Sequence, residues 1–306
     1  MAGVIAVLVL SQAGIDWAKD FEAAQAAAKA ADRRVMAHFQ LKGRPLCRAM
    51  DEETFTDGAV AAACARFVCV KIDIEAQPAL FDRAVGGRGG LGTAILDGTG
   101  DVVSVLPGYA GPQGFLLFLE KAEQGYPALK AAKDAAGGGS GPYALAELYR
   151  ELDSARRAEE CYRKAIEGGE PKWAALSHER LARMRVNRGK NVEARRHLEE
   201  YRKLDAEDRF GASGRALLTE ALAFNVERKY PEAIHVLEEG LKKNPDGEEA
   251  DLMVITVGIA EHELGRLKEA QKALEGMLGR YPKSRWAPLA REMIEHIKKP
   301  PPDHPH

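Results

Sequence analysis

Residues 34–55, RVMAHFQLKGRPLCRAMDEETF, decide how the first part of the chain is interpreted. The mainly apolar run Arg34–Phe39 predicts a buried β-strand, because a short apolar run is typical of a strand covered on both faces. Gly43-Arg44-Pro45 predicts a turn, since proline is favoured at the start of a helix and breaks a strand. Leu46–Glu53 then predicts a short helix. The stretch therefore predicts a strand, a turn and a helix in succession.

The same alternation of strands and helices continues on both sides of this stretch. Asp97-Gly98-Thr99-Gly100 has the composition of a hairpin turn between two short strands. Strands that alternate with helices and end in a hairpin predict a mixed sheet covered on both faces. We expect this α/β domain to span residues 15–126, with helices at 21–31, 58–66, 78–85 and 113–123 and further strands at 67–73, 93–96 and 102–106.

A linker is predicted at residues 127–142. Its centre contains Ala-Ala-Gly-Gly-Gly-Ser-Gly, and such a run neither favours a helix nor provides side chains that could be buried. After it the chain has the pattern of helices alone. We therefore place the boundary between two domains here, and a chain of 306 residues agrees with two domains.

Small residues recur at regular spacing in the second part of the chain. They come in pairs twelve residues apart, and each pair is followed after four residues by a large apolar side chain. Two helices of a hairpin can approach closely only where both carry small side chains, while the large residue fills the space beside the next hairpin. The pairs are Ala146 with Ala158, Ala182 with Ala194, Ala221 with Ala233 and Gly258 with Ala270, and the large residues are Tyr162, Leu198, Leu237 and Leu274.

This pattern resembles the tetratricopeptide repeat, a helical hairpin of about 34 residues. The resemblance covers residues 143–299 and implies an all-α solenoid of four hairpins with a terminal capping helix at Ser284–Lys298. It also implies a protein or peptide partner on the inner helices. From the register, Arg183, Asn187, Arg188 and Asn225 are the candidate residues of that groove. An irregular helical bundle is the alternative.

Residues 15–126 resemble a thioredoxin-like domain. In that family the strand ends in Trp-Cys-x-x-Cys-Lys, followed by Met, acidic residues and Thr-Phe; here Cys47-Arg48-Ala49-Met50 and Thr54-Phe55 match. Without gaps, Cys47 falls on the second cysteine and Arg44 on the first. The family's cis-proline falls on Leu91. The fold is therefore expected to be conserved in this chain, whereas its dithiol motif is reduced to one cysteine.

Disulfide exchange needs an exposed thiolate and a second thiol that resolves the mixed disulfide. Arg44 has no nucleophile, so we expect no dithiol cycle and no catalytic residue other than the candidate Cys47. That cysteine is either a single reactive thiol or an inherited buried one. Cys64 and Cys69 lie in apolar segments and are interpreted as core cysteines, and Cys161 as structural.

The overall composition excludes several classes of function. Forty-four Lys and Arg against 46 Asp and Glu leave a net charge of −2, so no global basic charge favours nucleic acid. No apolar run reaches the roughly 18 residues of a membrane helix. Gly87–Gly92 matches the dinucleotide pattern, but a predicted strand follows it where that site needs a helix. No cysteines have zinc-site spacing, so we expect neither cofactor nor metal.

The first residues give ambiguous evidence about the cellular location of the protein. The apolar run Val4–Leu10, followed by Ser11-Gln12-Ala13, resembles the core and cleavage site of a secretory signal, although a basic start is absent. We therefore treat 1–14 as a signal-like segment and expect export to the periplasm or another extracytoplasmic compartment, with a cytoplasmic location as the alternative. Residues 300–306 are expected to form a flexible tail.

These observations favour an adaptor, in which a thioredoxin-like domain with a degenerate motif is joined to a solenoid that binds a protein or peptide. The alternative is a thiol-dependent enzyme or chaperone-like helper that uses Cys47 alone.

Overall fold

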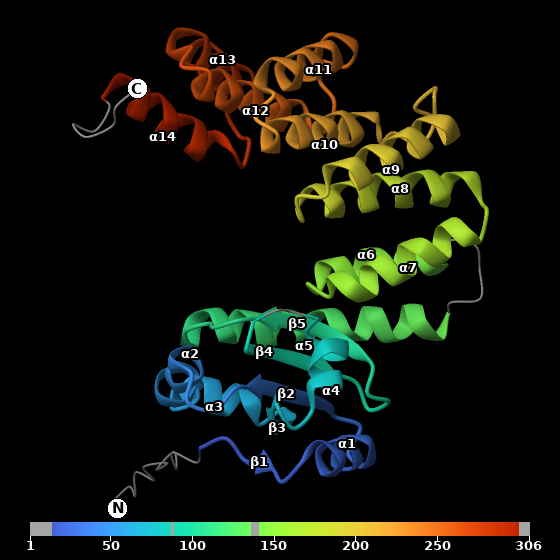
Figure 1. Cartoon of the computed structure of the whole chain (residues 1–306), viewed down its shortest axis with the longest axis vertical. Helices are drawn as coiled ribbons and strands as arrows, with labels where there is room; N and C mark the ends of the chain where they lie inside the picture. The colour runs from blue at the N-terminus through green and yellow to red at the C-terminus, as the bar shows by residue number, and fades with distance from the viewer. Residues whose placement is uncertain (1–13, 87–88, 136–140, 300–306) are drawn as a thin grey trace, which may run out of the picture. The chain divides into compact units, whose positions relative to one another are not determined.

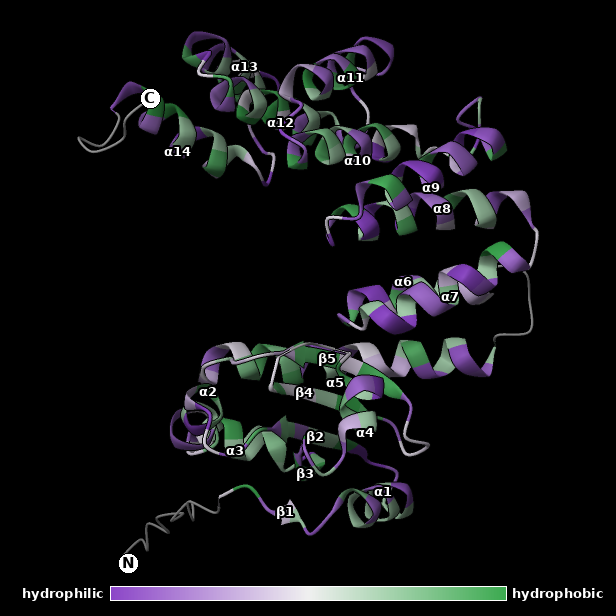
Figure 2. Cartoon of the chain, in the orientation of Figure 1, coloured by the Kyte–Doolittle hydropathy of each residue, from purple (hydrophilic) through white to green (hydrophobic). Residues whose placement is uncertain are grey.

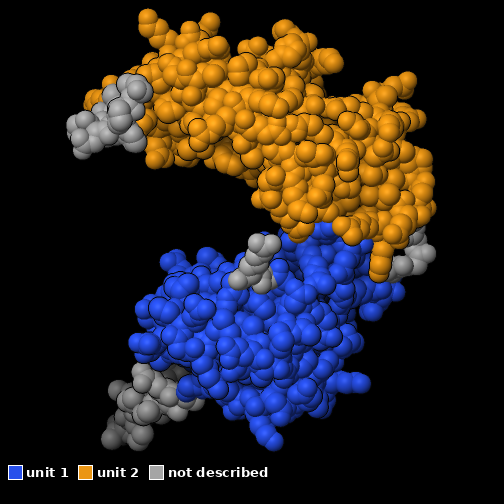
Figure 3. Space-filling model, in the orientation of Figure 1, with its two compact units in different colours: residues 1–161 blue, residues 162–306 orange. Residues whose placement is uncertain are grey.

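The structure is a computed structural model that describes residues 14–86, 89–135 and 141–299. It divides into two compact units, residues 1–161 and 162–306, shown in different colours in Figure 3. The signal-like segment up to residue 13, the centre of the predicted linker and the tail at 300–306 lie outside the described residues.

The first unit contains a five-stranded mixed sheet in the order β1-β3-β2-β4-β5 (Figure 1). β2 pairs parallel with β3 and antiparallel with β4, and the β4–β5 hairpin ends the sheet. The mixed sheet that the sequence predicts is confirmed. The strands are β1 (Trp17–Ala18), β2 (Arg34–Gln40), β3 (Phe67–Asp73), β4 (Leu91–Leu96) and β5 (Val102–Pro107).

Helices cover both faces of this sheet. Alternate residues of β2 point to opposite sides, so Val35, Ala37 and Phe39 pack with α1 and α4 in one core. His38 points to the other side, where its ring meets Phe55, and Phe55 in turn meets Phe115 of α5. The helices are α1 (Phe21–Ala30), α2 (Pro45–Ala49), a π-helical turn (Met50–Thr54), α3 (Gly58–Cys64), α4 (Pro78–Ala84) and α5 (Pro112–Asp134).

Helix α5 is longer than the sequence predicts. It continues through Pro127 to Asp134, so residues 127–134 are helical where a linker is expected. Tertiary contacts explain the extension: Leu129 is fully buried, and Lys133 donates to Asp97 over 2.9 Å. Packing and an ion pair stabilise this last part of the helix more than its composition alone suggests.

The first unit also includes a helical hairpin that follows the predicted linker. This hairpin consists of α6 (Gly141–Glu151) and the start of α7 (Ala155–Glu167). The Ser104 hydroxyl of β5 donates to the Leu152 carbonyl over 2.7 Å, and the Tyr149 hydroxyl donates to Asp101 over 3.0 Å. The compact unit therefore continues to Cys161, beyond the expected boundary at 127–142.

The second unit consists of helices within the described residues. α8 packs against α9, α10 against α11 and α12 against α13, while α10 also contacts α8 and α14 packs on α13. α9 is coloured largely as hydrophilic in Figure 2. The bounds are α8 (Pro171–Val186), α9 (Asn191–Leu204), α10 (Ser213–Val226), α11 (Tyr230–Lys243), α12 (Ala250–Glu263), α13 (Leu267–Arg280) and α14 (Ala287–Lys298).

The turns inside the helical hairpins share one backbone feature. Each contains a residue with positive φ five positions before the second small residue of its pair. Glycine adopts this left-handed conformation without the steric cost that Cβ imposes on other residues. The four residues are Asp153, Gly189, Arg228 and Gly265, with φ values of 58°, 69°, 58° and 72°.

Candidate functional site

The turn after β2 positions the candidate thiol. Gly43 has a φ of 80°, which favours glycine, and Arg44 follows as the extended residue that precedes α2. Pro45 occupies the start of α2, where its missing N–H costs no helical hydrogen bond. Cys47 therefore lies in the first turn of this short helix.

The structure brings the three sequence-predicted residues of this site together. Arg44, Cys47 and Leu91 line one pocket of about 380 Å³, together with Pro45, Leu46 and Gly90. Cys47 is 3% exposed, and its Sγ donates to the Gly90 carbonyl oxygen over 3.6 Å. Leu91 is buried as the first residue of β4, whereas Arg44 is exposed.

The pocket holds one thiol among the residues described. Cys64 and Cys69 are buried on α3 and β3 and do not line it, as the sequence predicts. A mixed disulfide formed at Cys47 would thus have no neighbouring protein thiol to resolve it. With Arg44 at the exposed position, the site can offer charge and an apolar rim to a partner, since the Leu46 side chain is 56% exposed.

His38 of β2 is a buried polar residue that the sequence pattern does not predict to be part of a site. Buried His38 makes a 2.9 Å hydrogen bond through Nδ1 with the Thr93 hydroxyl, and its Nε2 has no partner within the described residues. Burial lowers the pKa of His38 from 6.5 to about 3, and the charge of Lys71 acts in the same direction. The imidazole is therefore neutral at pH 7. The β2–β4 register creates this pair, which sequence spacing does not reveal.

The groove candidates lie towards the C-terminal ends of two helices. Arg183 is partly buried on α8, and Asn187 follows one turn later as its final cap. Arg188 is exposed in the next turn. Asn225 is partly buried near the end of α10, and its Oδ1 has no hydrogen-bond partner among the described atoms. α10 contacts α8, so Asn225 belongs to the neighbouring helix of the same layer.

A buried ion cluster on these helices was not predicted. Glu179 of α8 is 2% exposed and accepts a hydrogen bond from Arg215 of α10 over 3.3 Å. Arg180 lies 3.6 Å from the same carboxylate. Burial raises the pKa of Glu179, while the neighbouring arginines oppose that shift; burial lowers the pKa of Arg183, and Glu179 opposes it. The sequence signal for this ion cluster is Glu179, an acidic residue three positions before Ala182 on a largely apolar helix face.

The described part of the chain contains neither a membrane-spanning helix nor a metal-binding cluster of three or more side chains. None of its helices is both long and apolar enough to cross a membrane. Within the same residues, no group of three or more His, Cys, Asp or Glu side chains could hold a metal ion.

Comparison with known proteins agrees with the geometry of the first unit. A family model described as thioredoxin-like matches residues 16–89, which include β1 to β3, α2 and Cys47. No curated protein matches the chain. The five-stranded sheet, the helix that begins beside Cys47 and this match together identify the N-terminal part of the chain as a thioredoxin-like domain.

Proposed function

We propose that this protein is a non-catalytic adaptor, in which the thioredoxin-like domain and a helical repeat array each offer a contact surface to protein partners. The observation that carries this function is the pocket at the start of α2. Its thiol, Cys47, is buried, and Arg44 occupies the exposed position of the attacking cysteine. Such a site can bind a partner but has no dithiol to exchange.

We further propose that the helical hairpins are tetratricopeptide repeats. The alanines of the four small-residue pairs are all fully buried, and so are the four large residues that follow them. At Gly258 the crossing is so close that an added Cβ would lie 2.8 Å from Leu274 Cδ2. The turn residues with positive φ recur at spacings of 36, 39 and 37 residues, the same spacings as those of the small residues. Two independent features with one period support a repeat.

The chemistry of the inner helices favours an acidic peptide as the partner. Arg180 and Arg215 both lie beside the carboxylate of Glu179, and the Arg183 guanidinium adds a third positive charge close to it. Arg188 lies exposed one turn beyond. A group of arginine side chains attracts an anionic ligand, and the strength of that attraction depends on salt.

A charge reversal with a matched control tests this groove. The probe is a short fluorescein-labelled peptide rich in Asp and Glu, followed by fluorescence anisotropy at low and moderate salt. Arg188→Glu should weaken binding several-fold and reduce its salt dependence. Arg196→Glu, an equal change of charge at an exposed position of α9, should leave binding nearly unchanged. Equal losses in both variants would mean that only net charge attracts the peptide and would refute the groove.

A thiol-dependent enzyme or helper is the second candidate, and it is favoured by the position of Cys47 in a pocket rather than in a closed core. Rates of alkylation separate the two functions. A slow reaction of Cys47 in the native protein supports the adaptor, whereas a rate above that of a free thiol supports the enzyme.

We also propose export of the chain, on the basis of the signal-like run Val4–Leu10. Cell fractionation followed by N-terminal sequencing tests it. A protein that starts after Ala13 in an extracytoplasmic fraction supports export, and an uncleaved cytoplasmic protein contradicts it.

A further inference from the structure

Two cysteines lie close together where the end of α3 meets β3, outside the pocket that holds Cys47. Helix α3 ends at Cys64, a tight turn follows, and β3 begins at Phe67, so the strand brings Cys69 back to the helix end. The Cys69 Sγ donates to the Cys64 carbonyl oxygen over 3.5 Å. A hydrogen bond with the Cys64 thiol, together with burial, raises the pKa of Cys69. The Cys69 thiol therefore lies against the helix end that carries Cys64, and it is protonated in the free protein.

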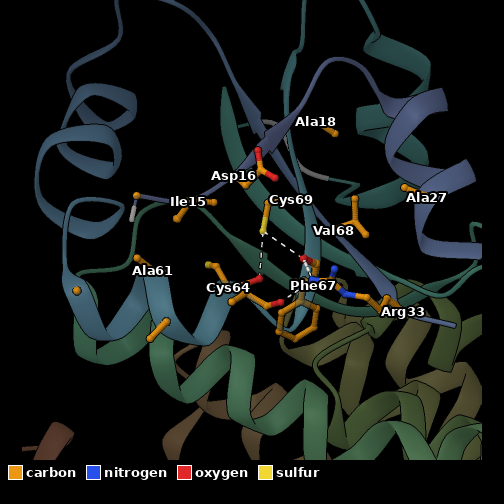
Figure 4. A pocket seen from close by; sticks show the side chains of 14 residues that line it. Ile15, Asp16, Ala18, Ala27, Arg33, Ala61, Cys64, Phe67, Val68 and Cys69 are labelled. Atoms are coloured by element: carbon orange, nitrogen blue, oxygen red, sulfur yellow. Dashed lines mark hydrogen bonds between the residues drawn. The ribbon is translucent and has the colours of Figure 1, made fainter. Parts of the chain in front are cut away.

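The pair borders a pocket rather than a filled core. Cys64 and Cys69 are 1% and 3% exposed, yet both line a cavity of about 840 Å³ between β1, α3 and the start of β3. Figure 4 shows the Cys69 sulfur between Asp16 and the helix end that carries Cys64. Most of the other lining residues are alanine or larger apolar residues.

The side chain of Arg33 places a positive charge near the two cysteines. Arg33 lines the same pocket, and its guanidinium donates to the Ala65 carbonyl over 2.5 Å and to the Phe67 carbonyl. These bonds hold it against the turn that links the two cysteines. Its charge favours the Cys69 thiolate, while Asp16 opposes it. A negative complex formed at the sulfurs would therefore have a fixed counter-charge.

We propose that Cys64 and Cys69 form a binding site for a soft monovalent metal ion of the Cu(I) class. Thiolates are the ligands that such ions prefer, and two of them satisfy a linear coordination. A zinc site needs three or four protein ligands, and the described residues contain no group of three or more His, Cys, Asp or Glu side chains that could supply them. On binding, each thiol releases its proton to solvent and each sulfur donates an electron pair to the metal. The complex carries one negative charge, which Arg33 stabilises and Asp16 opposes.

Anaerobic titration of the full chain with Cu(I), in competition with a chromophoric Cu(I) chelator, tests the site. The parent protein should take one ion from the chelator, and its affinity should rise with pH because protons are released. Cys64→Ala and Cys69→Ala should each abolish this uptake. Cys161→Ala, the matched control on α7, should retain it. Zn²⁺ in the same assay should not be retained.

Two further measurements keep the test decisive if a buried substitution impairs folding. In a Cys47→Ala/Cys161→Ala variant only the proposed pair remains, and it should still bind one Cu(I). Cu(I) should also raise the melting temperature of this variant, since a ligand that binds only the folded state stabilises it. Failure of that variant to bind Cu(I), or undiminished uptake by a folded Cys69→Ala protein, would overturn the assignment.

Discussion

The crossing of α12 and α13 offers the sharpest test of the helical packing. An alanine at Gly258 would place its Cβ 2.8 Å from Leu274 Cδ2 and 2.9 Å from Leu274 Cγ. Leu274 is fully buried, and because protein interiors are close-packed it can withdraw only by displacing its neighbours. We therefore expect Gly258→Ala to overpack the hairpin.

The magnitude follows from two opposing effects. Overpacking a filled core costs about 1–3 kcal/mol. Replacing glycine by alanine inside a helix contributes about 0.5–1 kcal/mol in the opposite direction. Gly276 of α13 isolates the second effect, because an added Cβ there would meet nothing within 4 Å. The free energies of unfolding of Gly258→Ala and Gly276→Ala should thus differ by about 1–3 kcal/mol, the overpacking cost alone.

Differential scanning calorimetry of the full chain measures this difference. In a domain of about 150 residues each kcal/mol shifts the melting temperature by about 2–4 °C. Gly276→Ala should melt slightly above the parent, and Gly258→Ala should melt about 2–12 °C below Gly276→Ala. If both alanines raise the melting temperature equally, α12 and α13 do not cross closely at Gly258 and the repeat register is wrong.

Three further predictions concern other parts of the chain. Reduction of a protein disulfide with dithiothreitol should proceed at the uncatalysed rate, and Arg44→Cys should restore little activity; turnover that is lost on Cys47→Ser would contradict the adaptor. Burial lowers the pKa of His197 from 6.5 to about 4 in the folded protein. Between pH 6.5 and about 4 the unfolded state therefore binds more protons than the folded state, and the free energy of unfolding should fall as the pH decreases through this range. Urea titrations at several pH values should show a weaker pH dependence for His197→Gln than for the parent protein. Arg228→Gly should stabilise the chain by about 1 kcal/mol: relief of the positive φ gains about 1–2 kcal/mol, and the larger conformational entropy of glycine in the unfolded chain offsets part of it. Gly189→Ala should destabilise the chain for the same reason. Equal melting temperatures of the two variants would exclude left-handed strain at these turns.

Much of the first unit could be predicted from local sequence. The strand at residues 34–39, the turn at Gly43 and the helix after Pro45 depend on residue types that act within a few positions of the chain. The same stretch carries the thioredoxin-like resemblance, which is confirmed over residues 16–89. The assembly of Arg44, Cys47 and Leu91 around one pocket agrees with that resemblance.

The long-range parts of the site could not be predicted in this way. The pairing of His38 with Thr93 depends on the β2–β4 register, and the ion pair of Glu179 with Arg215 depends on the contact of α8 with α10. The proposed Cys64–Cys69 pair depends on how β3 returns to the end of α3. In each case the partners are brought together by packing between elements, which sequence spacing does not encode directly.

The sequence by itself determined the alternation of strands and helices, the loss of the first redox cysteine and the period of the small residues, because each is a local property of residue type and spacing. Tertiary structure alone decided how far α5 extends and where the first unit ends. Leu129 is buried and Lys133 pairs with Asp97, and these contacts extend the helix into residues whose composition indicates a linker. Contacts with Ser104 and Asp101 likewise hold the first helical hairpin to the sheet domain. Burial and ion pairs formed between distant segments outweigh weak local preferences, and for that reason the boundary had to be found in the folded chain.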